Sequence, residues 1–213
     1  MAREIQYMSE NDRLWAEWYW KNINELEAFC HTLSIFVYEA RNQSAAIRAY
    51  ENIFHANCNS SSSNVFFNMA YKSIWHELLM ELAKLFDPSK EGNNKNCSLL
   101  RLKEMCLDKK YASLFPGGEN HLFVCAIDII YEQYASLLIK KSRNKQLSHH
   151  DLKQLFEEQP IEISFKNTEE LVLKISSLLE IIYSHVAFAE VSFGNYTNLV
   201  SQYEYALKQL VVK

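Results

Sequence analysis

The sequence predicts an all-α protein, a helical bundle built around one hydrophobic core. Only four glycines and three prolines occur in 213 residues, which argues against a β-rich fold with many turns. Apolar residues recur at steps of three and four along most of the chain, as on the buried face of an amphipathic helix. Because 48% of the residues are hydrophobic, the chain can bury a sizeable core. We therefore expect a single domain, residues 1–213, of about six to eight helices.

The composition also narrows the class of protein. No run of about twenty apolar residues is present and the N-terminus lacks a signal-peptide layout, so we expect a cytoplasmic protein without a membrane partner. The net charge of −4 argues against a globally basic nucleic-acid coat, so any contact with RNA must be local.

The five cysteines are scattered and form no Cys-x-x-Cys motif, which is typical of free thiols in a reducing compartment. His55-x2-Cys58 and His121-x3-Cys125 resemble halves of metal sites, but neither has a convincing second half. We therefore predict no metal site and no cofactor.

The N-terminal half predicts two long helices. The first is rich in aromatic residues, and we interpret its apolar stripe as core and subunit interface rather than as a platform for stacking bases. Asp87-Pro88 ends the second helix, since proline cannot continue it. The predicted elements are a helix over 11–40 that continues to Phe54, a loop over 57–64, a helix from Ser63 or Asn64 to about Phe86, and a polar loop over 89–96.

The C-terminal half predicts shorter helices and then two further long ones. Ser98 caps a helix to about Leu107, and 108–120 is a turn region. The next helix, 121–145, is expected to carry Leu122, Cys125, Ile129, Ala135, Leu138 and Ile139 into the core. There follow a short helix over 152–158, an alternating stretch over 161–165 that is too short to found a sheet, a helix capped by Asn167 or Thr168 that runs to Val186, a break at Gly194-Asn195, and a terminal helix over 198–212.

The densest group of functional side chains lies between Lys140 and Asp151. An arginine binds phosphate with two parallel hydrogen bonds, and a histidine exchanges protons near neutral pH. Ser148 and Asp151 have the spacing of a capping box, which predicts that a new helix begins there with both histidines in its first turn. The stretch contains Lys140, Lys141, Arg143, Asn144, Lys145, Ser148, His149, His150 and Asp151.

Residues 143–151, Arg-Asn-Lys-Gln-Leu-Ser-His-His-Asp, resemble the signature of the HEPN superfamily, an arginine and a polar residue followed after a short spacer by a histidine. The five-residue spacer and the aspartate two positions after His149 are most similar to the abortive-infection branch of the AbiU type. Two upstream stretches also resemble that branch: Glu81–Pro88, which ends in Leu-Phe-Asp-Pro, and Ser98–Leu102. The core of the resemblance covers about residues 67–152.

The resemblance implies a HEPN-like antiparallel helical bundle with additional flanking helices. It further implies a metal-independent endoribonuclease of a toxin–antitoxin or phage-defence system, whose site is completed across a homodimer. The implied partners are RNA, a second copy and a cognate antitoxin protein. In that reading Arg143 and His149 are catalytic, Asn144 supports them, Asp151 orients an imidazole or caps its helix, and Lys140, Lys141 and Lys145 attract the RNA backbone.

Two alternatives remain open from the sequence. His150 is the second candidate for the acting histidine, because a six-residue spacer also falls within the superfamily's range. The chain can instead be a non-catalytic module that binds RNA, a nucleotide or a partner protein, as several relatives are. A third reading makes Lys140–Asp151 an ordinary solvated turn of a helical scaffold.

Overall fold

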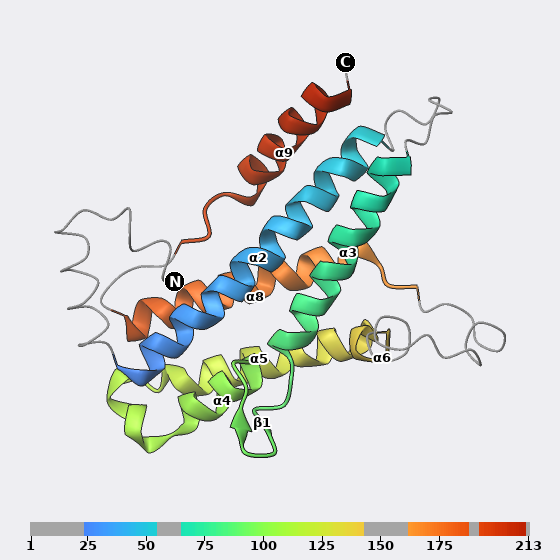
Figure 1. Ribbon diagram of the computed structural model, residues 1–213. Coiled ribbons are helices and arrows are strands. Elements are labelled where there is room, and N and C mark those ends of the chain that lie inside the picture. Colours follow the sequence, from blue (N-terminus) through green and yellow to red (C-terminus); the bar gives the residue numbers. More distant parts are fainter. Residues whose placement is uncertain (1–23, 55–64, 143–161, 188–191, 212–213) are drawn as a thin grey trace, which may run out of the picture.

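The computed structural model describes residues 24–54, 65–142, 162–187 and 192–211, and within these ranges the protein is almost entirely helical (Figure 1). This confirms the predicted all-α fold class. None of the helices in these ranges is long and apolar enough to cross a membrane. The elements are α2 (Glu25–Phe54), α3 (Val65–Leu85), β1 (Lys90–Glu91), β2 (Asn94–Lys95), α4 (Leu99–Leu107), the 3-10 helix η2 (Lys109–Leu114), α5 (Glu119–Ser136), α6 (Ile139–Ser142), α8 (Phe165–Val186) and α9 (Tyr196–Val211).

Helix α2 is the element against which α3, α8 and α9 all pack. Its 30 residues span about 45 Å at 1.5 Å per residue. Asn24 begins it by accepting a hydrogen bond from the Glu27 amide on its side-chain oxygen, while its side-chain nitrogen donates to the Val186 carbonyl at the end of α8. One residue thus caps α2 and joins it to α8.

The polar stretch after α3 is a small hairpin rather than the predicted loop. The chain turns after Leu85 through hydrogen bonds from the Phe86 and Asp87 amides to carbonyls of the last helical turn. Strands β1 and β2 then pair antiparallel, and Gly92 makes the turn with a φ of 59°, which a residue without a Cβ adopts at little cost. Both strands are exposed.

Helix α4 begins where the sequence predicts. Ser98 is its N-cap, with Oγ accepting from the Arg101 amide at 3.3 Å. The predicted turn region after it contains η2, because Asp108 caps a 3-10 helix by accepting from the Lys110 amide, and the buried Tyr111 anchors that helix in the core.

The prediction of which face of α5 is buried was wrong, apart from Ile139 just beyond its end. The segment is apolar on two faces, so its periodicity fits two registers, and aromatic packing decides between them. Phe123 packs edge-on against Phe115, and Tyr134 stacks on Phe86 with ring centroids 4.1 Å apart. The buried side chains are Phe123, Ile127, Ile130 and Tyr134, whereas Leu122, Cys125, Ile129, Ala135 and Leu138 are exposed.

Helix α8 starts earlier than predicted. Ser164, not Asn167 or Thr168, is the N-cap, and its Oγ accepts from the Asn167 amide at 3.4 Å. Phe165 of the alternating stretch is therefore already helical. Gly194, with a φ of 69°, precedes α9, which runs alongside α2 (Figure 1).

One large apolar cluster holds α2, α3, α4, α5 and α8 together, and a smaller one lies between α2 and α9. The buried residues of α2 and α3 recur at steps of three and four, as the sequence predicts for the buried faces of amphipathic helices. The fully buried side chains of the large cluster include Leu26, Leu33, Leu78, Leu82, Leu102, Ile127, Leu171 and Leu179, and the small one contains Ala45, Ala49 and Val200.

Candidate functional site

The predicted helix over 121–145 is interrupted just before the basic stretch. Helix α5 ends at Ser136, and Leu138 takes a φ of 57°, in the left-handed region that non-glycine residues rarely occupy. Ile139 then begins the four-residue α6 and is fully buried. With Ile139 held in the core, Lys140 and Lys141 are both exposed to solvent. Two of the predicted RNA-binding cations therefore lie on a short segment that is anchored by a buried neighbour.

The end of α6 and the start of α8 lie at the same end of the bundle (Figure 1). Helices α5 and α8 pack against each other in opposite directions, and Lys174 of α8 donates from Nζ to Gln133 Oε1 of α5 at 2.8 Å. The amino end of α8 carries the positive end of the helix dipole. A phosphate at this end of the bundle would therefore meet a helix dipole and two exposed lysines of favourable charge.

Acidic and basic side chains are mixed at the amino end of α8. Lys166 is exposed there, as are Glu162 and Glu170. With Lys140 and Lys141, these exposed side chains are three lysines and two glutamates, and the buried Glu169 is paired with Arg48. The positive character of this end is therefore local and modest, as the overall charge of −4 requires.

The predicted catalytic residues themselves lie outside the described residues. These are Arg143, Asn144, His149, His150 and Asp151, and the third predicted RNA-binding cation, Lys145, lies there too. Arg143 directly follows Ser142, the last residue of α6. The two described lysines and the arginine are thus consecutive parts of one short segment, and the assignments of catalytic roles stay predictions.

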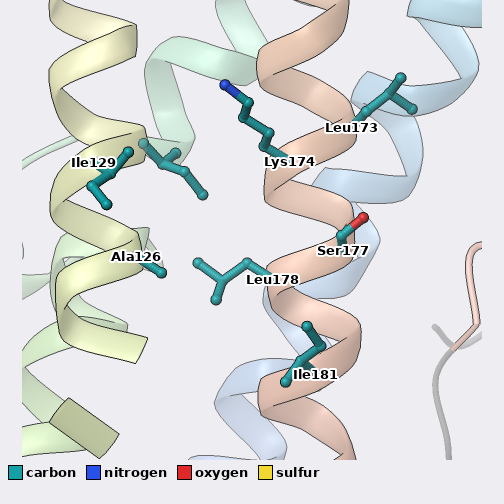
Figure 2. Close-up of a pocket in the computed structure, with 8 residues that line it drawn as sticks. Ala126, Ile129, Leu173, Lys174, Ser177, Leu178 and Ile181 are labelled. Carbon is teal, nitrogen blue, oxygen red and sulfur yellow. The ribbon is translucent and has the colours of Figure 1, made fainter. Parts of the chain in front are cut away.

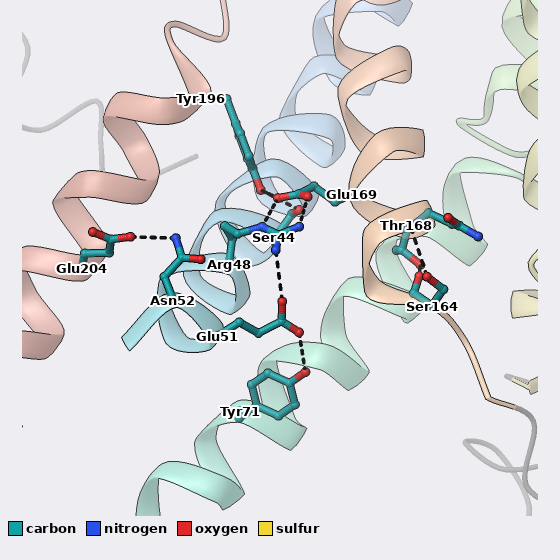
Figure 3. A network of polar contacts seen from close by, with 11 residues as sticks. Ser44, Arg48, Glu51, Asn52, Tyr71, Ser164, Thr168, Glu169, Tyr196 and Glu204 are labelled. Atoms are coloured by element: carbon teal, nitrogen blue, oxygen red, sulfur yellow. Dashed lines mark hydrogen bonds and ion pairs between the residues drawn. The ribbon is translucent and has the colours of Figure 1, made fainter. Parts of the chain in front are cut away.

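Sequence reasoning missed a part-buried cluster of polar residues where α2, α3, α8 and α9 meet, which we call the Arg48–Glu169 cluster (Figure 3). The Glu169 carboxylate of α8 accepts two hydrogen bonds from the Arg48 guanidinium of α2, one of them from Nε at 2.9 Å. Tyr196 of α9 donates its hydroxyl to the same carboxylate at 2.9 Å. The cluster consists of Ser44, Arg48, Glu51, Tyr71, Glu169 and Tyr196.

The remaining contacts extend this cluster to α3. Arg48 also pairs with Glu51 at 3.3 Å, and Tyr71 of α3 donates to Glu51 at 3.4 Å. The Arg48 guanidinium lies 4.8 Å from the centre of the Phe165 ring, within range of a cation–π interaction. Four helices, α2, α3, α8 and α9, are therefore joined by one charged group and its partners.

The electrostatics of the Arg48–Glu169 cluster are those of a structural contact. The hydrogen bonds that Arg48 donates to Glu169 raise the pKa of Arg48, so its charge is retained. Burial, assisted by Glu51, raises the pKa of Tyr71 to about 12, and burial also raises the pKa of Tyr196. These three groups keep their usual charge state near neutral pH, so none of them titrates there. One signal was available in the sequence: Ser44, Arg48 and Glu51 share a helix face at i, i+4 and i+7.

Within the described ranges, no group of three or more His, Cys, Asp or Glu side chains is placed to hold an ion. His121 and Cys125 are both exposed on α5, while His55 and Cys58 lie outside those ranges.

Comparison with known proteins gives a match to a protein-family model. No curated protein and no solved structure matches the chain. The model of the HEPN_AbiU2 family, described as AbiU2, matches residues 14–207. This match covers almost the whole sequence and includes both the described helices and the stretch from Arg143 to Asp151, so the resemblance to the AbiU-type branch is confirmed. The chain belongs to the AbiU2 family of HEPN proteins.

Proposed function

We propose that this protein is a metal-independent endoribonuclease of an abortive-infection system, with a site made of Arg143 and His149 from two copies. The observation that carries the proposal is the Arg143-x5-His149 motif in a chain of the HEPN_AbiU2 family. The exposed Lys140 and Lys141, which lead directly into that motif, support it because they supply cations for the RNA backbone.

The reaction that these side chains can perform is internal transfer at a phosphodiester. His149 of one copy takes the proton from a ribose 2′-hydroxyl, and the 2′-oxygen then attacks the adjacent phosphorus. The bond from phosphorus to the 5′-oxygen breaks, and His149 of the other copy donates a proton to that leaving oxygen. The products are a 2′,3′-cyclic phosphate and a free 5′-hydroxyl. Two histidines are needed at once, which accounts for the role of two copies.

Arg143 acts on the phosphate rather than on protons. Its guanidinium carries a permanent charge and two parallel N–H groups, which suit the extra negative charge that develops on the phosphoryl oxygens in the transition state. Asn144 assists by hydrogen bonding to the phosphate or to the imidazole. Asp151 caps the helix or orients His149, while His150 is the alternative proton carrier.

A cleavage assay tests the proposal. Purified protein is incubated with RNA in EDTA, beside Arg143→Ala, His149→Ala and His150→Ala. Lys72→Ala serves as a matched control, because Lys72 is an exposed cation on α3 outside the proposed site. We expect cleavage by the wild type and by the Lys72 and His150 variants, and a loss of at least about 100-fold in the other two. The RNA ends should carry cyclic phosphate.

Three outcomes would contradict the proposal. Equal cleavage by all five proteins would mean a contaminant or another site. A strict requirement for a divalent cation would exclude the proton-transfer chemistry written above. RNA binding that weakens with salt, without cleavage, would favour the non-catalytic module instead.

A further inference from the structure

Helix α5 carries an apolar stripe on the surface of the molecule. Leu122, Cys125 and Ile129 follow one another at steps of three and four, so they share one face. Leu122 is 70% exposed and Ile129 is 63% exposed, and Cys125 is exposed between them. The opposite face of the same helix is fully packed in the core. The stripe is therefore surplus to what the described fold needs.

A groove runs beside this stripe, between α5 and α8 (Figure 2). Its volume is about 420 Å³. On the α8 side it is bordered by Ile181, which is 51% exposed. Lys174 and Ser177 are the polar side chains among its lining residues, and Lys174 is bonded to Gln133. The lining residues are Ala126, Ile129, Ile130, Leu173, Lys174, Ser177, Leu178 and Ile181.

The size of this face suits a protein interface. Helix α5 has 18 residues, so the face is about 27 Å long, and two neighbouring helices make it about 20 Å wide. Its flat footprint is therefore on the order of 500 Å², before the relief of the side chains is counted. A stable interface buries about 800 Å² on each partner. The face thus supplies most of what a dimer requires, with an apolar centre and polar edges.

We propose that this α5–α8 face is where a second copy of the chain docks. A ridge formed by Leu122 and Ile129 lies next to a groove, so the same patch can be both knob and hole, as a two-fold symmetric interface demands. Leu122, Cys125 and Ile129 are uncharged, and the nearby Asp128 is paired with Lys103 of α4. Over these three residues a second copy meets no like charge. Beyond them the exposed Glu132 follows Ile129 on the same face and Lys174 lines the groove, so the charged groups beside the stripe include one of each sign.

The α5–α8 face is thus the surface through which the two copies of the proposed function would meet. The choice of a second copy as the partner rests on that proposed function. Helix α5 leads through α6 to Lys140 and Lys141. If the two α5 helices run in the same direction, both α6 segments lie at one end of the dimer. That arrangement brings the two copies of the basic segment together, as the composite site requires.

Light scattering and sedimentation over a range of concentrations test the interface. We expect a dimer for the wild type and at least a tenfold weaker dimer for Ile129→Glu and Ile181→Glu, since each places a charge in the apolar centre. Met69→Glu is the matched control, because Met69 is 66% exposed but lies on α3. It should dimerise as the wild type does. Circular dichroism and thermal melting establish that each variant is folded.

Cys125 reports on the same face directly. At protein concentrations above the dimer dissociation constant, its modification by a maleimide, located by peptide mass spectrometry, should slow several-fold compared with dilute protein. A short bis-maleimide should link Cys125 of one copy to Cys125 of the other. Ser136→Cys, seven residues beyond Ile129 on the same helix face, should also link if the two α5 helices run in the same direction.

The outcomes separate this inference from the proposed function. A monomeric wild type, or a dimer that Ile129→Glu and Ile181→Glu leave intact, overturns the docking face. Protection of Cys125 in a monomer at every concentration also overturns it, because the chain's own segments would then cover the face. A dimer that both variants weaken, without RNA cleavage, upholds the docking face and contradicts the ribonuclease. RNA cleavage by a dimer that neither variant weakens upholds the ribonuclease and contradicts the docking face.

Discussion

The two sides of α8 differ in how completely their side chains are buried and hydrogen-bonded by the rest of the chain. Toward α2 and α9, even the carboxylate of Glu169 has three hydrogen bonds, and Leu179 is fully buried. Toward the α5 groove, Ile181 stays half exposed, two residues from Leu179 on the same helix. Burial of a charge is tolerated only with partners, and exposure of an apolar patch is tolerated only where something else covers it. The first side holds the fold, and the second is available for association.

Removal of a buried side chain from the first side has the largest expected effect. Leu179→Ala should lower the free energy of unfolding by about 2–5 kcal/mol, because it removes buried methyl groups and leaves a cavity. Ile181→Ala, measured at concentrations where the protein is monomeric, should change it by about 0.5 kcal/mol or less. Urea unfolding followed by circular dichroism gives both values. Equal losses in the two variants would mean that Ile181 is as deeply packed as Leu179.

Breaking the Arg48–Glu169 cluster should be somewhat less costly. Glu169→Ala removes the acceptor that the partly exposed Arg48 and the Tyr196 hydroxyl share, although Arg48 keeps Glu51 and Tyr196 keeps Ser44, and we expect a loss of about 2–3 kcal/mol. Its neighbour Glu170, which is exposed, is the matched control, and Glu170→Ala should stay within about 0.5 kcal/mol. Urea unfolding followed by circular dichroism gives the free energy of unfolding of both variants. A Glu169 variant as stable as the Glu170 variant would show that the cluster does not hold the four helices together.

The pH dependence of stability gives the smallest effect. The pKa of Tyr71 is raised from about 10 to about 12, first by burial and then by Glu51, so folding favours its neutral form. The resulting stabilisation is present in full below about pH 10 and is lost as the pH rises toward about 12. Urea midpoints between pH 9 and 11 should therefore fall less steeply for Tyr71→Phe than for the wild type. Parallel curves would contradict a role for Tyr71 in this linkage.

The fold class and most helices follow from local pattern. Scarce glycine and proline, the periodicity of Leu78, Leu82 and Leu85, and the cap at Ser98 act within a few residues of the chain, so the sequence was sufficient to predict them. The register of α5 was predicted wrongly because the helix is apolar on two faces. Only the packing of Phe123 and Tyr134 against other aromatic rings chose between them.

The candidate site divides in the same way. Its chemistry was predicted from consecutive residues, and family membership supports that prediction. The exposure of Lys140 and Lys141 depends on the burial of Ile139, which the sequence predicted, and on the left-handed Leu138, which the periodicity did not indicate. The pairing of Arg48 with Glu169 joins residues 121 positions apart, and no pattern on either helix specified its partner.

The helix-forming segments, the cap at Ser98 and the residues able to move a proton and bind a phosphate could be recognised in the sequence, because each depends on neighbours only a few positions away. The packing of the helices decided which apolar face is buried, which carboxylate pairs with which guanidinium and which surface stays exposed. These choices depend on shape and burial among residues that are distant in sequence, and such contacts exist only once the helices are assembled.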